Sequence, residues 1–297
     1  MRWQGRRGSA NIEDRRRSRK TGTGRGRKIK LPSGASKLSP KAIVLVVGLL
    51  VVAQVMGVDV VGLLSQEVGT SQSTTPQTIT KADERAGRFV SVTLADTEEV
   101  WAEIFREQVG RAYRPVTLVL FKGVTPSPCG NASGATGPFY CPGDQKAYLD
   151  TDFFVTLSRR LGAGGDVAQA YVIAHEVAHH VQNELDILEG ANRERQRSSK
   201  VRSNAISVQI ELQADCFSGI WARKAEEMFG SLEKGDLEEA LNAARAIGDD
   251  TLQRNAGKRP MPHTFTHGTS QQRQKWFDIG YKSAEIRECD TFSASKL

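Results

Sequence analysis

Histidine and cysteine are scarce in this chain, which has five histidines and four cysteines among 297 residues. No two cysteines have the C-x-x-C spacing, which disfavours a zinc site built from thiolates. No internal repeat is visible in the sequence. Because histidine is so rare here, two histidines at a metal-binding spacing carry more information than they would in a histidine-rich chain.

One such pair is present. Residues 175–179 read His-Glu-Val-Ala-His, the H-E-x-x-H pattern, inside a segment with helical periodicity. Histidines four apart lie on one face of a helix and can hold one zinc ion, while Glu176 reaches a water on the metal as general base. The helix is expected to open with a capping box of Asp166 and Gln169 and to stop near Gly190. The alternative is an amphipathic helix that merely carries two histidines.

A catalytic zinc held by His175 and His179 needs a third protein ligand and one open position. The metzincin extension would place Gly and His where this chain has Gln182 and Leu185, so that family is excluded. His180 is expected to point away from the zinc face.

A better third ligand lies in a second expected helix, over residues 204–228. Glu211 and Asp215 are four apart and therefore share a face. Glu211 can complete a His-His-Glu site, and Asp215 can orient a ligand histidine through its free N–H. Alone, such an acidic pair is typical of solvated surface charge. Apolar neighbours and the preceding H-E-x-x-H helix favour the ligand interpretation.

Positive charge is concentrated at the N-terminus. Residues 1–41 hold fourteen Lys or Arg against two acidic residues, a balance of +12, so with a total of +7 the rest of the chain carries −5. Residues 42–64 form an apolar run that, at ~1.5 Å per residue, can span a hydrocarbon core of about 30 Å. Basic charge before such a run keeps that side in the cytoplasm. The pattern predicts a basic cytoplasmic arm followed by one uncleaved transmembrane helix.

Two other interpretations of the N-terminus are weaker. The basic arm would suit nucleic acid, but the apolar run that follows favours a membrane. A signal peptide is disfavoured by the long basic region and by the lack of a clear small-x-small cleavage site. Residues 65–82 are expected to be a linker and residues 83–297 a single domain in the periplasm or outside the cell. No nucleic acid is expected as a partner, and the oligomeric state is left open.

The cysteines fit an oxidising compartment. Four cysteines allow three pairings, and the sequence alone does not choose among them. We predict that Cys129 pairs with Cys141, because they flank a short turn-rich loop, which leaves Cys216 with Cys289.

The remaining patterns indicate an α+β domain that is mostly helical, with a small sheet. Strands are expected at 116–121 and 146–150, and a helix around 97–109. Further helices are expected from Asp236 to Gly248, where Glu239 completes a capping box, and from about Ser270. An exposed strand edge above the metal-binding helix could pair with an extended peptide; the alternative is that Tyr148 simply packs in the core.

The sequence resembles the bacterial family of neutral zinc metallopeptidases, membrane-anchored proteins with a gluzincin-like H-E-x-x-H and E-x-x-x-D arrangement. The stretches that carry the resemblance are Met1–Trp3, Gly137–Pro142, Tyr148–Asp150, His175–Gln182, Glu211–Gly219, Thr266–Gly268 and Gln272–Arg273. The resemblance implies a zincin-like catalytic domain with one zinc ion per chain. It also favours His267 over His263 as a donor to the oxyanion formed in peptide hydrolysis, although His267 could equally cap a helix.

The expected function is that of a membrane-anchored zinc metallopeptidase acting on a peptide or protein, with Glu176 as general base. Three alternatives stay open: an inactive zinc-holding protein that binds peptides, a hydrolase of another amide that uses the same triad, and a binding module that faces the cytoplasm.

Overall fold

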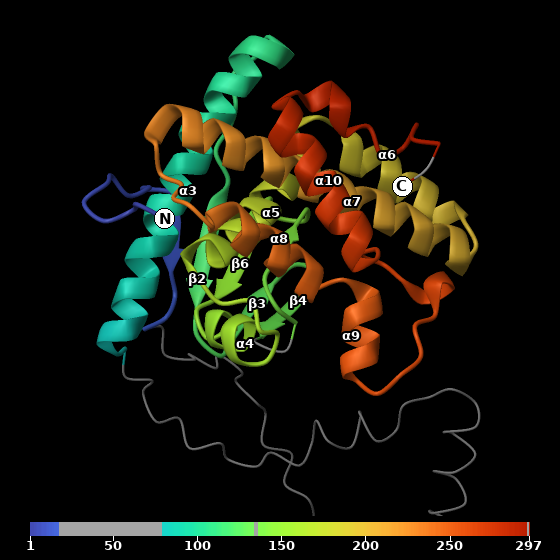
Figure 1. Cartoon of the computed structure of the whole chain (residues 1–297), viewed down its shortest axis with the longest axis horizontal. Helices are drawn as coiled ribbons and strands as arrows, with labels where there is room; N and C mark the ends of the chain where they lie inside the picture. Colours follow the sequence, from blue (N-terminus) through green and yellow to red (C-terminus); the bar gives the residue numbers. More distant parts are fainter. Residues whose placement is uncertain (18–78, 134–135, 296) are drawn as a thin grey trace, which may run out of the picture. The chain divides into compact units, whose positions relative to one another are not determined.

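The computed structural model describes residues 1–17, 79–133, 136–295 and 297 (Figure 1). The predicted transmembrane helix at 42–64 lies outside the described residues, as do the rest of the basic arm after residue 17 and most of the linker. Among the helices of the described part, none is both long enough and apolar enough to cross a membrane.

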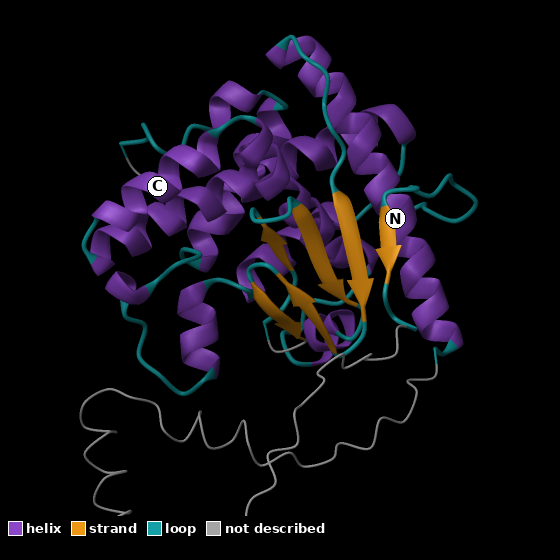
Figure 2. Cartoon of the chain, turned by 180° about the vertical axis from the view of Figure 1, so that it is seen from behind, coloured by secondary structure: helices purple, strands orange, loops and turns teal. Residues whose placement is uncertain are grey.

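A four-stranded sheet has the order β1-β2-β6-β5 (Figure 2). Its strands are β1 Ile12–Asp14, β2 Thr117–Phe121, β6 Lys146–Asp150 and β5 Phe139–Cys141. The first three are parallel to one another, and β5 pairs antiparallel with β6. The expected strands at 116–121 and 146–150 are confirmed as β2 and β6. A separate hairpin, β3 Val124–Ser127 with β4 Gly130–Ser133, follows β2.

Helices make up most of the described chain, so a mostly helical α+β domain with a small sheet is confirmed. They are α3 Lys81–Ile104, α4 Phe153–Arg159, α5 Asp166–Glu184, α6 Ile187–Arg197, α7 Lys200–Phe229, α8 Asp236–Ala246, α9 Asp249–Asn255 and α10 Ser270–Ser283. A π-helical turn at Phe105–Val109 extends α3, and 3₁₀ turns occur at Pro262–Thr264 and Ile286–Cys289.

Helices α7 and α10 pack backbone against backbone. A Cβ atom on Gly280 would lie 1.8 Å from the carbonyl oxygen of Cys216, and one on Gly219 would lie 2.0 Å from that of Phe277. Only glycine fits at these two positions, because any side chain would push the helices apart. This close approach brings the first half of α10 onto the face of α7 that carries Asp215.

Two expected capping boxes are wrong. Helices α5 and α8 begin after Gly165 and Gly235, which have positive φ and make no side-chain cap. Asp166 instead accepts a hydrogen bond from the indole of Trp3 at 2.9 Å. Helix α5 also ends at Glu184, earlier than the expected stop at Gly190, which lies within α6.

The first seventeen residues belong to the folded domain. The Trp3 ring is buried edge-to-face against Phe89 of α3, with centroids 5.4 Å apart. Arg6 forms an ion pair of 2.7 Å with the buried carboxylate of Asp96, also on α3. Residues 12–14 form β1 against β2. The prediction of a basic arm separate from the domain is therefore wrong for residues 1–17, because their arginines meet acidic groups and their apolar residues enter the core.

Candidate metal centre

The structure brings the three predicted metal ligands together. His175 and His179 project from α5, and Glu211 projects from α7. One ligand atom of each lies within 4.8 Å of the others. His175 Nε2 is 3.0 Å from one oxygen of Glu211, and His179 Nε2 is 3.6 Å from the other. Two imidazole nitrogens and one carboxylate suit zinc with an open fourth position.

Asp215 is hydrogen-bonded to Nδ1 of the first ligand histidine, His175. Its Oδ1 lies 3.0 Å from His175 Nδ1, so this nitrogen can donate its hydrogen to the carboxylate and leave Nε2 free for a metal. Asp215 is fully buried and also accepts hydrogen bonds from Tyr171 and from Arg273, at 2.8 and 2.9 Å for the latter. Burial alone would raise the pKa of Asp215, but Arg273 and His175 outweigh it and lower that pKa.

His175 is strongly basic as long as no metal competes for it. Burial lowers the pKa of its imidazole, but hydrogen bonds with Asp215 and Glu211 outweigh burial and raise it to about 10. A metal ion that binds through Nε2 therefore displaces a proton.

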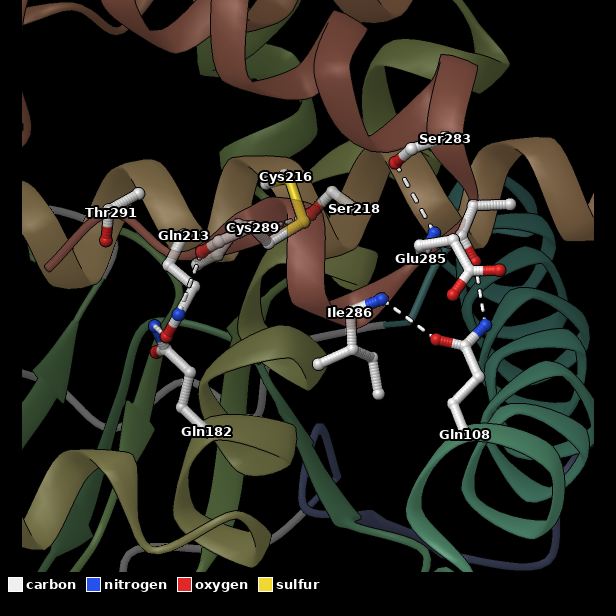
Figure 3. The surroundings of a disulfide bond; sticks show 12 residues. Gln108, Gln182, Gln213, Cys216, Ser218, Ser283, Glu285, Ile286, Cys289 and Thr291 are labelled. Atoms are coloured by element: carbon white, nitrogen blue, oxygen red, sulfur yellow. Dashed lines mark hydrogen bonds between the residues drawn. A yellow bond between two sulfur atoms is a disulfide. The ribbon is translucent and has the colours of Figure 1, made fainter. Parts of the chain in front are cut away.

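Hydrogen-bonded amide side chains orient the second ligand histidine, and Figure 3 shows Gln182, Gln213 and Cys289 of this chain. His179 Nδ1 donates to the side-chain oxygen of Gln182 at 2.9 Å. The amide nitrogen of Gln182 donates to Gln213 at 3.0 Å, and that of Gln213 donates to the carbonyl of Cys289 at 2.9 Å. Since Gln182 accepts at Nδ1, the Nε2 of His179 is the nitrogen left for the metal.

Glu176 is the unpartnered group of the site. Its side chain is 8% exposed, and its Oε2 is buried with no hydrogen-bond partner among the described residues. Burial raises the pKa of this carboxyl. A carboxylate kept free of protein partners beside two metal ligands can take up a proton from a water molecule.

His267 lies near the metal ligands, whereas His263 does not share their pocket. The backbone N–H groups of residues 266, 267 and 268 all donate to Asp249, at 2.7, 2.6 and 3.0 Å. The His267 ring lies 3.3 Å from the same carboxylate and lines a pocket that Glu211 also lines. Burial lowers the pKa of His267, but the hydrogen bond with Asp249 and the negative charges of Glu211 and Asp249 together outweigh burial and raise this pKa. His263 is exposed, and its backbone carbonyl accepts a hydrogen bond from the side-chain amide of Asn204.

The other residues singled out in the sequence have structural contacts. His180 is buried between a carbonyl of residue 114, at 2.7 Å, and the hydroxyl of Tyr140, at 3.2 Å. Tyr148 packs in the core, where its ring stacks on Phe139. The predicted disulfides are confirmed, Cys129 with Cys141 and Cys216 with Cys289. The sequence analysis assigns no role in the site to Arg273, which binds Asp215, or to Gln182, which orients His179.

Two histidines one turn apart on a helix, with a glutamate from the next long helix, are typical of zinc metallopeptidases. The chain belongs to the family described as "Putative neutral zinc metallopeptidase", which matches residues 1–292.

Its relatives include "Uncharacterized protein YpfJ" of Escherichia coli K12, 46% identical over 296 residues, which are 99% of this chain and 100% of that protein. Another is "Uncharacterized protein Rv2575" of Mycobacterium tuberculosis, 41% identical over 261 residues, 82% of this chain and 86% of that protein. No solved structure matches the chain.

Proposed function

We propose that this protein is a zinc-dependent metallopeptidase in which Glu176 is the general base. The observation that carries the proposal is the convergence of His175, His179 and Glu211 beside Glu176, whose buried Oε2 has no hydrogen-bond partner among the described residues. The family description supports the same class of hydrolase.

The chain's own residues supply positioning and proton transfer. Zinc, when bound, supplies Lewis acidity that makes water more acidic and polarises a carbonyl. Glu176 accepts the proton of the attacking water and passes it to the leaving amine. Asp215 and Gln182 keep both imidazoles in the orientation that presents Nε2. His267, steadied by Asp249, donates a hydrogen bond to the developing oxyanion.

A strand edge for the substrate backbone is also available. Strand β5 is the last strand of the four-stranded sheet beside β6. It is tied to the metal-binding helix through the hydroxyl of Tyr140 and His180 of α5. An extended peptide that adds to such an edge is held through main-chain hydrogen bonds.

The metal assignment is tested on the full chain, because residues 1–17 belong to the domain. Purified protein should contain about one zinc per chain by elemental analysis, and His175→Ala or Glu211→Ala should lose most of it, because each removes one of three protein ligands. His263→Ala, outside the cluster, is the matched control and should retain zinc.

Full zinc in both ligand variants would refute the assignment. The activity is tested by incubating the wild type with a denatured protein mixture, with and without a chelator, and identifying new termini by mass spectrometry. An absence of chelator-sensitive cleavage would leave a zinc-holding protein that only binds peptides.

A further inference from the structure

A pocket of about 310 Å³ opens beside the metal ligand Glu211. It is lined by Arg195 of α6, by Ser207, Ile210 and Glu211 of α7, and by Thr266 and His267 from the segment before α10. A substrate group in this pocket would lie next to the bond being cleaved, because Glu211 is part of the metal cluster.

The guanidinium of Arg195 has no acidic partner within ion-pair distance in the described part of the chain. Its hydrogen bond goes to the side-chain oxygen of Asn192, at 3.2 Å, and its Nε is buried with no acceptor. Its neighbours behave differently: Arg193 pairs with Glu189, and Arg202 pairs with Glu194.

Burial without an acceptor distinguishes Arg195 from an ordinary surface arginine. A buried guanidinium N–H that has lost its water and has no acceptor in the protein costs free energy. A ligand that supplies an acceptor removes this cost. The one carboxylate in the pocket lining, Glu211, is already engaged with His175. The planar guanidinium is suited to bind a carboxylate through two hydrogen bonds.

We propose that Arg195 binds a carboxylate group of the substrate, so that this pocket selects peptides with an acidic group next to the scissile bond. The inference rests on the proposed peptidase function and adds a substrate class to it. The carboxylate can come from an Asp or Glu side chain or from a free peptide C-terminus. Both sources present the same fork of two oxygens to Arg195.

Cleavage of matched peptides tests the subsite. One series replaces Glu by Gln at each position that flanks the cleaved bond, and a second compares a free with an amidated C-terminus. The wild type should favour one acidic form by about 10- to 100-fold in kcat/KM, carried mainly by KM, as expected for a charge-assisted hydrogen bond. Arg195→Gln should remove the preference, Arg195→Lys should keep part of it, and Arg195→Glu should shift it toward lysine-containing peptides.

Arg197→Gln is the matched control. Arg197 is exposed in the same last turn of α6 and does not line the pocket, so the preference should be unchanged. If Arg195→Gln loses the preference for a free over an amidated C-terminus, the ligand of Arg195 is the terminal carboxylate. If it loses the preference for Glu over Gln, the ligand is an acidic side chain. Equal preference in the wild type and Arg195→Gln would overturn the inference.

A binding measurement separates this inference from the proposed function. Zinc-loaded Glu176→Gln protein is titrated with the same peptides, and affinity is followed by fluorescence anisotropy. Tighter binding of the acidic peptides that disappears in Glu176→Gln/Arg195→Gln supports the subsite, even if the wild type cleaves nothing and the peptidase proposal fails. Equal affinity for acidic and amide forms overturns the subsite, even if hydrolysis is observed.

Discussion

Glu176→Gln should lower the rate of peptide hydrolysis by roughly 10²- to 10⁴-fold while zinc stays bound, the loss typical when a general base is removed. Glutamine has the same shape as glutamate but cannot accept the proton of the attacking water. Because Glu176 makes no hydrogen bond through its buried Oε2, the exchange breaks no known contact there. Zinc content, thermal unfolding and kcat are measured on the same preparation.

Glu189→Gln serves as the control, because Glu189 is an exposed residue of α6 whose ion partner is Arg193. It should change neither zinc content nor kcat. If Glu176→Gln hydrolyses peptides as fast as the wild type, another group accepts the proton and the proposed mechanism is wrong.

Arg273→Met should lower the free energy of unfolding of the metal-free protein by about 3–5 kcal/mol, the loss typical when one partner of a buried ion pair is removed. Arg273 is 2% exposed and donates to both oxygens of Asp215, which has no exposed surface. Methionine fills part of the volume but takes the guanidinium away from the carboxylate, which keeps His175 and Tyr171 as partners. Urea denaturation measures the change, in the presence of a chelator so that zinc binding does not contribute.

An exposed ion pair provides the comparison. Arg223 pairs with Glu227 one turn along α7, and Arg223→Met should leave the free energy of unfolding nearly unchanged, because an exposed ion pair contributes little. Neutralising Asp215 should recover part of the lost free energy of unfolding, so Arg273→Met/Asp215→Asn should be more stable than Arg273→Met alone. Equal stabilities of Arg273→Met and the wild type would mean that Arg273 does not hold Asp215 in place.

The metal ligands could be predicted because their arrangement is largely local. Helical spacing puts His175 with His179 on one face, and it puts Glu211 with Asp215 on another. Only the meeting of the two faces depends on tertiary structure. Arg273 could not be found this way, since it lies 58 residues from Asp215 and reaches it through the close packing of α7 on α10. No periodicity in the sequence encodes that contact.

The fold shows the same division between local and distant information. Strand β2 is recognisable from its β-branched apolar run, and α7 from its apolar spacing and terminal Gly230. Strand β1 is only three residues long and lies among arginines, so its sequence shows no apolar strand pattern. The capping boxes expected for α5 and α8 are wrong because a glycine, rather than a residue with a capping side chain, precedes each helix.

The pairing of β1 with β2 joins the N-terminus of the chain to the domain that carries the metal centre. Ile12 lies opposite Leu118 in one sheet, and Ser9 and Ser91 exchange hydrogen bonds at 2.9 and 3.2 Å. Cysteines placed at Ser9 and Ser91 should cross-link in the purified protein under mild oxidation, because residues 9 and 91 are hydrogen-bonded to each other.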